Sequence, residues 1–182
     1  NVDVRRYDLK ALREKIGFIP QKALLFTGSI NENIRYGKHN AVQTEVEHSA
    51  KVAQAYDFIT EKPKQFEEMI EEGGGNVSGG QRQRLSIARA VVRKPDIYIF
   101  DDSFSALDFK TDANLRKQLK YETKDAITLI VAQRVTSIMD ATRIIVLNEG
   151  AVVGIGTHRE LLKTCSIYHE IALSQLSEEE LA

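Results

Sequence analysis

The chain has 182 residues, of which 42% are hydrophobic and 28% charged, and its 25 basic residues nearly balance its 26 acidic ones. The length suits one domain with one main core, and the composition is typical of a soluble globular protein. The charge balance provides no strong field that would attract nucleic acid or anionic lipid. Cys165 is the only cysteine, which excludes an internal disulfide and a cysteine-built metal site.

The first 70 residues predict short elements followed by a helical region. The chain opens without Met directly into this pattern, which we interpret as a cut end. Asp8 can cap a helix through Lys15, and Ile16 to Pro20 is typical of a strand that ends at a proline. Ser29 to Glu32 and Thr44 to Glu47 match the capping box, in which a hydroxyl and a carboxylate satisfy the first free amides of a helix. The stretch from about Gln43 to Ile70 has no strong strand pattern, which indicates a helical subdomain.

After a glycine-rich break at 71–76 the pattern becomes α/β. Short apolar runs predict strands at 97–100, 128–132 and 144–147, with helical stretches at 81–93, 110–122 and 135–140. Strands buried on both faces with helical crossovers indicate a parallel sheet. Residues 148–150 predict a turn into a hairpin strand at 151–155, and Thr157 to Glu160 caps a final helix. No run of about 18 apolar residues is present, so the sequence predicts no membrane span.

Residues Ser78-Gly79-Gly80-Gln81 combine a predicted helix start with two glycines. Ser78 and Gln81 have capping-box spacing, and the glycines remove side chains at the tip. Free amides and the positive end of the helix dipole would then face outward and could receive a phosphate, with the Ser78 hydroxyl and the Gly80 amide as donors. Taken alone, the pattern favours an ordinary capped helix after a glycine linker, because caps are common and phosphate sites are rare; the surrounding sequence reverses this preference.

Asp101 and Asp102 directly follow the predicted strand at 97–100. In open α/β sheets, ligands collect at the carboxyl ends of the strands. Two adjacent carboxylates repel each other unless a cation is near, and Mg²⁺ prefers oxygen ligands. The sequence therefore predicts that Asp101 binds Mg²⁺, through water, and that Asp102 orients or activates an attacking water. The alternative is a pair of acids that cap the following loop.

The order of these motifs resembles the nucleotide-binding domain of ABC transporters, most closely the multidrug and lipid exporter branch, over essentially the whole chain. The matching segments are Ile19–Gln21 for the Q-loop, Phe26–Ile34 with Tyr36–Gly37 for the exporter segment after it, Val77–Gln81 for the signature, Ile97–Asp101 for Walker B and Ser105–Asp108 for the D-loop. The resemblance implies ATP and Mg²⁺ as cofactors. It also implies nucleotide contacts from Gln21, Ser78, Gly79, Gly80, Gln81 and Asp108, with Gln21 beside Asp101 at the metal.

The resemblance implies a P-loop NTPase-like α/β fold, a partial parallel-sheet core with an inserted helical subdomain. Residues 1–40 would form a core segment with the Q-loop, and 41–76 the helical subdomain, which continues into the signature helix to about 93. Residues 94–175 would form the α/β core with Walker B, the D-loop and the switch loop, and 176–182 an acidic tail. The implied partners are a second such domain, bound head to tail, and the coupling helices of a transmembrane domain, which Glu72 would contact. The implied location is the cytoplasmic face of the cell membrane.

Three departures from the family pattern matter. No Gly-rich loop ending in Lys-Ser/Thr is present, so the chain alone is expected to bind ATP poorly and to be inactive. Asp102 occupies the position of the usual catalytic glutamate; its carboxylate is about 1 Å or more short, a displacement that can cost on the order of 100-fold in rate. Gln133 replaces the switch histidine, and its amide cannot carry a positive charge.

Two changed catalytic positions, Asp102 and Gln133, beside a nearly intact signature suggest the degenerate half of a heterodimeric exporter. In that arrangement Ser78–Gln81 would complete a fully active site on the partner. A symmetric homodimer with a slow site is the alternative within the family. A soluble ABC ATPase without a transport role, and a module that holds ATP without hydrolysing it, are the alternatives outside it.

Overall fold

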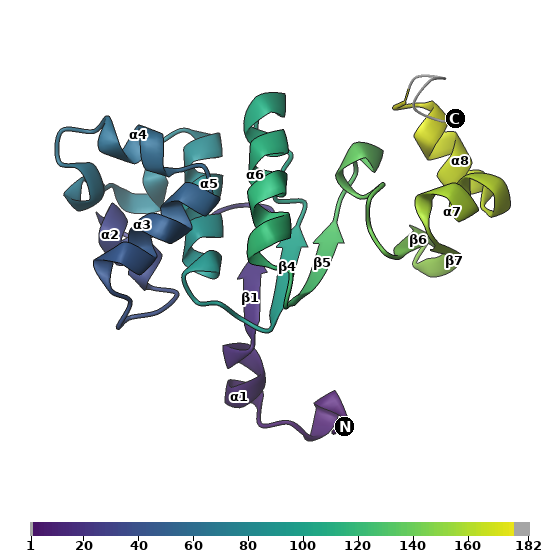
Figure 1. Ribbon diagram of the computed structural model, residues 1–182, viewed down its shortest axis with the longest axis horizontal. Coiled ribbons are helices and arrows are strands. Elements are labelled where there is room, and N and C mark those ends of the chain that lie inside the picture. The colour runs from purple at the N-terminus through teal and green to yellow at the C-terminus, as the bar shows by residue number, and fades with distance from the viewer. Residues whose placement is uncertain (1, 177–182) are drawn as a thin grey trace. The chain divides into compact units, whose positions relative to one another are not determined.

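The computed structural model describes residues 2–176, and its chain divides into two units, the first ending at Val131 and the second beginning at Ala132. In the first unit, strands β1 (Ile16–Ile19), β4 (Ile97–Asp101) and β5 (Ile127–Val131) form a parallel sheet in the order β1-β4-β5 (Figure 1). The register pairs Ile19 with Phe100, and Asp101 with Val131. The predicted parallel sheet is therefore confirmed, and Asp101 closes its central strand.

Two short helices, α1 (Leu9–Glu14) and α2 (Ile30–Arg35), begin at predicted caps. Asp8 accepts a hydrogen bond from the Ala11 amide, and Ser29 forms the full capping box with Glu32. The prediction at Thr44 is wrong. Helix α3 (Gln43–Val52) begins two residues earlier, where the Val42 amide donates to the Glu45 carboxylate at 3.0 Å. An acid at the third helical position satisfies this amide without a capping hydroxyl.

The rest of the first unit consists of helices and short turns. The remaining bounds are 3₁₀ turns Val4–Arg6, Gln65–Glu67 and Glu72–Gly74, helices α4 (Tyr56–Thr60), α5 (Gly79–Val91) and α6 (Phe109–Glu122), and strands β2 (Gly28–Ser29) and β3 (Met69–Ile70). Strands β2 and β3 pair antiparallel. The predicted helical stretch therefore ends in a strand at Met69–Ile70, because these residues pair with a segment some forty positions away.

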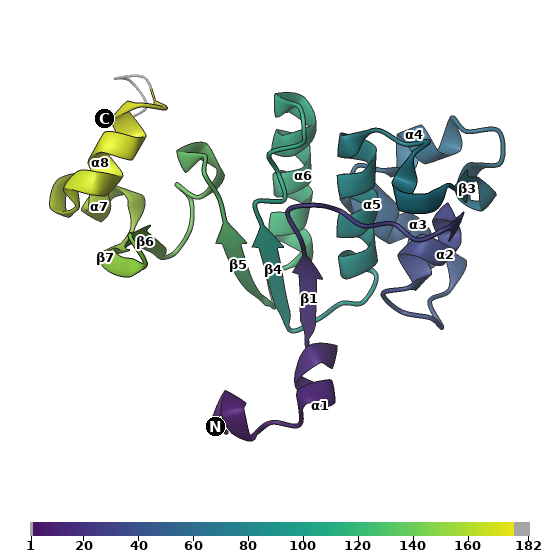
Figure 2. The ribbon, with the colours of Figure 1, turned by 180° about the vertical axis from the view of Figure 1, so that it is seen from behind.

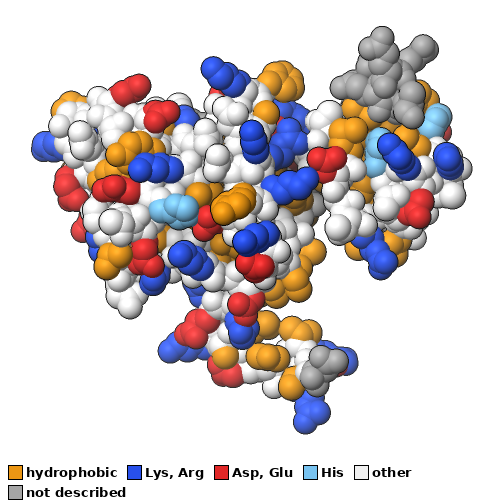
Figure 3. Space-filling view, in the orientation of Figure 1, with side chains coloured by type: hydrophobic (Ala, Val, Ile, Leu, Met, Phe, Trp, Pro, Cys, Tyr) orange, Lys and Arg blue, Asp and Glu red, His pale blue; other side chains and the backbone are white. Residues whose placement is uncertain are grey.

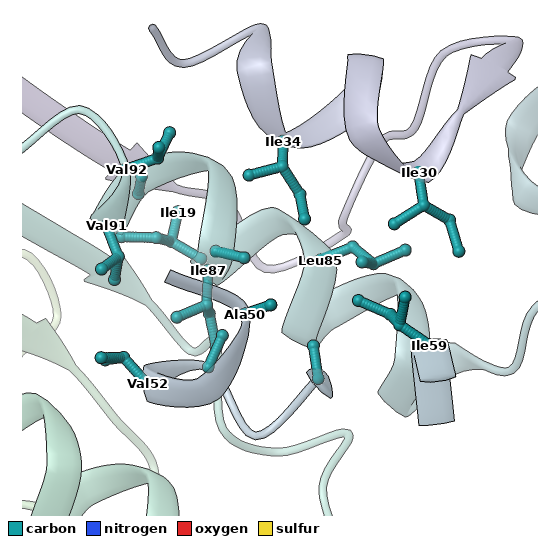
Figure 4. Close-up of a cluster of buried hydrophobic side chains, with 14 of the residues drawn as sticks. Ile19, Ile30, Ile34, Ala50, Val52, Ile59, Leu85, Ile87, Val91 and Val92 are labelled. Carbon is teal, nitrogen blue, oxygen red and sulfur yellow. The ribbon is translucent and has the colours of Figure 1, made fainter. Parts of the chain in front are cut away.

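Helix α5 provides the centre of the core of the first unit. Figure 4 shows Leu85 and Ile87 of α5 among side chains of α2, α3 and α4, including Ile30, Ala50 and Ile59. All five of these side chains are fully buried. Since burial of one such aliphatic side chain contributes roughly 1.5–3 kcal/mol, this cluster fixes the signature helix against the helical insertion.

The two faces of the parallel sheet differ. One face carries the buried side chains of Ile19, Tyr98 and Phe100 and lies beneath helices α5 and α6. The other face, toward the viewer in Figure 2, carries exposed apolar side chains, among them Phe18 (55% exposed) and Leu129 (52%). The expectation of strands buried on both faces is therefore wrong for the described residues, since no helix of the first unit lies over this side.

The second unit is built on an antiparallel hairpin of β6 (Ile144–Asn148) and β7 (Ala151–Gly156). Helices α7 (His158–Thr164) and α8 (Ser166–Leu173) pack beside it, and residues from the hairpin and both helices share one core. Thr157 forms the predicted capping box of α7 with Glu160.

Three expectations for the second unit need correction. The predicted strand at 144–147 pairs with β7 and does not join the parallel sheet. The helix expected at 135–140 is a single 3₁₀ turn, Val135–Ser137. The predicted final helix is divided at Cys165, whose extended backbone separates α7 from α8.

The predicted boundaries at 40, 76 and 93 remain predictions, and residues 177–182 of the predicted acidic tail lie outside the described residues. Within residues 2–176, no helix has the length and apolar character needed to cross a bilayer. Acidic and basic side chains are interspersed on the face of the first unit in Figure 3.

Candidate functional site

The structure brings the predicted Q-loop glutamine to the predicted Walker B pair. Gln21 follows β1 and Asp102 follows β4, and these strands are hydrogen-bonded neighbours. The Gln21 Nε2 donates to Asp102 Oδ2 at 3.0 Å, although the two residues are 81 positions apart. Asp101 is the last residue of β4 and is half-buried. Gln21 and Asp102 are therefore in contact at the carboxyl edge of the sheet, next to Asp101 at the end of β4, where such folds bind ligands.

Asp102 adopts a left-handed backbone conformation, with φ of +44°. Its amide donates to the Val131 carbonyl at 2.9 Å, and its own carbonyl accepts from Ser105 Oγ at 2.9 Å. Asp tolerates this conformation better than most residues because its short polar side chain can hydrogen-bond locally. The turn after β4 is therefore held at both ends, which fixes the position of the carboxylate that Gln21 contacts.

Ser103, which the sequence analysis did not single out, ties this turn to the Q-loop. Its buried hydroxyl donates to the Ile19 carbonyl at 2.9 Å. The side chain thus connects the turn after β4 to the end of β1, one residue before Pro20. A serine next to a pair of aspartates carries no distinctive sequence signal, because its partner lies 84 positions away.

The residues Ser78–Gln81 form the predicted helix tip. The Gln81 amide donates to Ser78 Oγ at 3.2 Å, while Gln81 Oε1 accepts from the Ser78 amide at 3.0 Å. This capping box uses Ser78 Oγ as an acceptor, so its hydroxyl hydrogen can still donate to a phosphate oxygen. Helix α5 has 13 residues, and its N-terminal dipole favours an anion at this tip.

The second glycine of the tip lies against the predicted D-loop. A Cβ at Gly80 would come within 3.2 Å of the Ala106 carbonyl oxygen, closer than side chains normally approach a backbone oxygen. Packing within the chain therefore favours glycine here, because a side chain would require the Ala106 carbonyl to shift by a few tenths of an ångström.

Asp108 caps helix α6 at the end of the D-loop. Its Oδ1 accepts from the Thr111 amide at 2.9 Å, and this backbone hydrogen bond lowers the pKa of the exposed Asp108 carboxyl. The carboxylate is therefore ionised and held at the N-terminus of α6. Gly79, at the N-terminal tip of α5, is exposed.

Gln133 belongs to the second unit. Its side chain is exposed, and its carbonyl accepts from the Gln175 side chain at 2.9 Å. The structure therefore groups Gln21 with Asp101 and Asp102, and Ser78 with Gly79, Gly80 and Gln81.

The residues at the sheet edge have the donor set that Mg²⁺ prefers. Asp101 contributes carboxylate oxygens, and Gln21 retains its amide oxygen because its nitrogen is used toward Asp102. Hard oxygen ligands in small number suit Mg²⁺, which keeps several waters and binds nucleotide phosphates. The chemistry of these residues therefore fits the predicted ion.

A partly enclosed cavity of about 450 Å³ lies beside the Q-loop, lined by Phe18, Leu24, Phe26, Tyr36 and three arginines, Arg13, Arg89 and Arg93. The Arg89 guanidinium lies over the rings of Phe26 and Tyr36, and burial lowers its pKa. The cavity is thus lined by apolar and aromatic side chains together with three arginines.

Comparisons with known proteins agree with these features. The sequence profile of the family described as ABC transporter matches residues 1–105. An uncharacterized ABC transporter ATP-binding protein of Bacillus subtilis is 44% identical over 170 residues, covering 93% of this chain and 29% of that protein. ATP-binding cassette sub-family B member 5 of Homo sapiens is 38% identical over 173 residues, covering 95% of this chain and 14% of that protein.

The structure is also similar to a solved bacterial Atm1-family ABC exporter with ATP bound. The TM-score is 0.93 at 34% sequence identity, with 97% of this chain and 31% of that chain covered. The chain spans about 30% of the length of the bacterial relatives that it matches. With the family profile covering more than half of its residues, the chain belongs to the ABC transporter family.

Proposed function

We propose that this chain contributes to ATP hydrolysis in an exporter and supplies the weaker of two nucleotide sites in a heterodimer. The observation that carries the proposal is the 3.0 Å hydrogen bond from Gln21 Nε2 to Asp102 Oδ2. It supports a working arrangement of Q-loop and Walker B residues around a carboxylate that is one methylene shorter than the family's glutamate.

In the proposed mechanism, Asp101 and the Gln21 amide oxygen would hold Mg²⁺, which would neutralise charge on the bound phosphates. Asp102 accepts a hydrogen bond from the attacking water, and Gln21 orients the Asp102 carboxylate through their contact. Because Asp102 is short and Gln133 carries no positive charge, this site is slow. Ser78 and the amides of the α5 tip stabilise negative charge on the γ-phosphate bound by the partner domain.

The proposed partners are a second ATP-binding domain and a transmembrane domain at the cytoplasmic face of the membrane. The cavity beside the Q-loop supports the proposed contact with a transmembrane domain. It adjoins Leu24, three residues after Gln21, and its apolar wall suits a helix from the transmembrane domain. The exposed Glu72, which the family resemblance assigns to the same partner, belongs to a 3₁₀ turn before the signature.

The test is to disable one site at a time in the full-length protein paired with its partner. Asp102→Asn should reduce ATP turnover by less than about threefold, since a slow site contributes little to the total rate. The matching change in the partner should abolish turnover.

Equal loss from both changes would contradict the heterodimer and favour two equivalent sites. ATPase activity that needs no transmembrane domain would favour a soluble ABC ATPase instead. Binding of ATP without hydrolysis at this site in a single-turnover assay would favour the module that only holds ATP.

A further inference from the structure

Side chains of helix α5 donate hydrogen bonds to the backbone on both sides of Gln21. Before Gln21, the Gln83 Nε2 donates to the Pro20 carbonyl at 3.2 Å. After Gln21, an Arg89 nitrogen donates to the Leu24 carbonyl at 2.9 Å. Both side chains belong to the helix whose N-terminal tip is Ser78. The position of the Q-loop is therefore set by the signature helix as well as by its own strand.

Gln83 is buried to an extent unusual for its type, with 1% of its surface exposed. A buried amide that lost its partner would cost on the order of 1–3 kcal/mol, so its hydrogen bond has to be maintained as the helix moves. Gln83 lies one turn before Ile87 on the buried side of α5, at a position where an apolar residue would satisfy packing alone.

Three successive residues of the Q-loop segment carry these contacts. The Ile19 carbonyl accepts from Ser103, the Pro20 carbonyl accepts from Gln83, and the Gln21 side chain donates to Asp102. Ser103 and Asp102 are neighbours in the turn after β4, whereas Gln83 comes from α5. Gln83 therefore provides a direct hydrogen bond between the signature helix and the residue preceding Gln21.

Arg89 makes two further hydrogen bonds in addition to the one to the Leu24 carbonyl. Its Nε and its remaining terminal nitrogen donate to the Asn33 carbonyl and the Asn33 side-chain oxygen, each at 2.9 Å. Asn33 in turn accepts from the Phe26 amide and donates to the Phe26 carbonyl. The chain after the Q-loop is thereby held as one hydrogen-bonded unit against α5, so α5 contacts the segment on both sides of Gln21.

We infer that Gln83 is a positioning residue that links the two nucleotide half-sites carried by this chain. The tip of α5 serves the partner's nucleotide, and Gln21 serves the chain's own, so this inference rests on the proposed function. When the tip engages a γ-phosphate, Gln83 carries the shift of α5 to the Pro20 carbonyl and so to the contact between Gln21 and Asp102.

The test uses the full-length protein with the partner's site disabled and measures single-turnover ATP hydrolysis at this chain's own site. Gln83→Met keeps the length of the side chain and removes the donor. It should lower the single-turnover rate constant by about five- to tenfold, the loss expected for one hydrogen bond, and leave the ATP concentration that gives half the maximal rate within about twofold of the wild-type value. The matched control is Ser49→Ala, which removes a buried hydroxyl whose hydrogen bond stays within α3. The control should keep the wild-type rate constant.

A double-mutant cycle with Gln21→Ala separates a positioning role from a structural one. If Gln83 acts through Gln21, the double variant should hydrolyse ATP at the rate of Gln21→Ala alone. Additive losses, or an unaltered rate in Gln21→Ala beside a reduced one in Gln83→Met, would overturn the inference. A wild-type protein without Mg²⁺-dependent ATPase activity would instead contradict the proposed function.

Gln83→Glu provides a second variant of the same shape in case Gln83→Met does not fold. A protonated carboxyl can donate to the Pro20 carbonyl, whereas a carboxylate cannot. The rate of Gln83→Glu relative to wild type should therefore fall as pH rises, by about fivefold or more across the titration of this carboxyl. A ratio that stays constant across this titration would overturn the inference, and so would a thermal unfolding midpoint that falls in parallel with the rate, because ionisation of a buried carboxyl can also destabilise the fold.

Discussion

At the scale of single residues, Asp102 combines a short carboxylate with a left-handed backbone. A longer acid at this position would extend the carboxylate but would fit the backbone less well. Glutamate would extend the carboxylate toward the position that the family uses, but it adopts φ near +44° less readily than aspartate. The cost of the backbone strain is of order 1 kcal/mol, whereas misplacement by about 1 Å can cost 100-fold in rate, or nearly 3 kcal/mol. The gain from a longer carboxylate should therefore exceed the cost of the backbone strain.

Asp102→Glu is accordingly expected to raise single-turnover ATP hydrolysis at this chain's own site by roughly tenfold or more. The measurement is single-turnover hydrolysis in the full-length protein with the partner's site disabled. Asp102→Asn is the control, because it keeps the length and the backbone preference and removes only the charge. A rate in Asp102→Glu no higher than wild type would show that carboxylate reach does not limit this site.

At the scale of secondary-structure elements, the start of α5 has two roles that can be separated by comparison with α2. Ser78 and Ser29 each form a full capping box, with Gln81 and Glu32 respectively. Replacement of either serine by alanine should lower stability by about 1 kcal/mol through loss of the cap.

Only Ser78→Ala should also impair catalysis, because Ser29 has no role at a nucleotide in the proposed function. We expect Ser78→Ala to lower turnover at the partner's site by about tenfold or more, and Ser29→Ala to leave it near wild type. ATPase rates and thermal unfolding midpoints of both variants test this. Equal ATPase losses in the two variants would show that Ser78 acts only as a helix cap.

The same scale shows what the sequence could predict and why the rest was missed. The caps at Asp8, Ser29, Ser78 and Thr157 were predictable because donor and acceptor lie within three residues of each other. The contacts of Ser103 and Gln83 were not, because their partners lie 84 and 63 positions away and no local pattern identifies them. A polar side chain on the apolar face of α5 was the available signal for Gln83.

The predicted strand at 144–147 shows a related limit. Its apolar pattern was detected, but an apolar run does not specify its partner. In the structure the adjacent turn at 149–150 directs it into a hairpin, with positive φ at both Glu149 and Gly150. The family resemblance, by contrast, implied Gln21 beside Asp101 at a metal, and the structure shows that β1 and β4 are parallel neighbours whose ends lie at one edge. The hydrogen bond between Gln21 and Asp102 was not predicted.

At the scale of the whole molecule, the uncovered face of the parallel sheet governs how the 182-residue chain behaves by itself. Phe18, Ile127, Leu129 and Val131 are each more than half exposed on this face, whereas parallel sheets are ordinarily covered on both sides. An exposed apolar patch of this kind promotes association between chains. The isolated chain should also bind ATP only weakly, since its sequence contains no Gly-rich phosphate loop.

We therefore expect the isolated chain to self-associate at micromolar concentration, and Leu129→Lys to shift it toward monomer. Leu129 lies on the edge strand β5, where a lysine both interrupts the apolar face and repels a second copy. Tyr121→Lys is the matched control, because Tyr121 is 73% exposed on α6, outside the sheet. Sedimentation of the three proteins over a range of concentrations measures the effect. If both lysine variants shift the monomer fraction equally, net charge rather than the sheet face controls association; if neither does, the face is not the contact between chains.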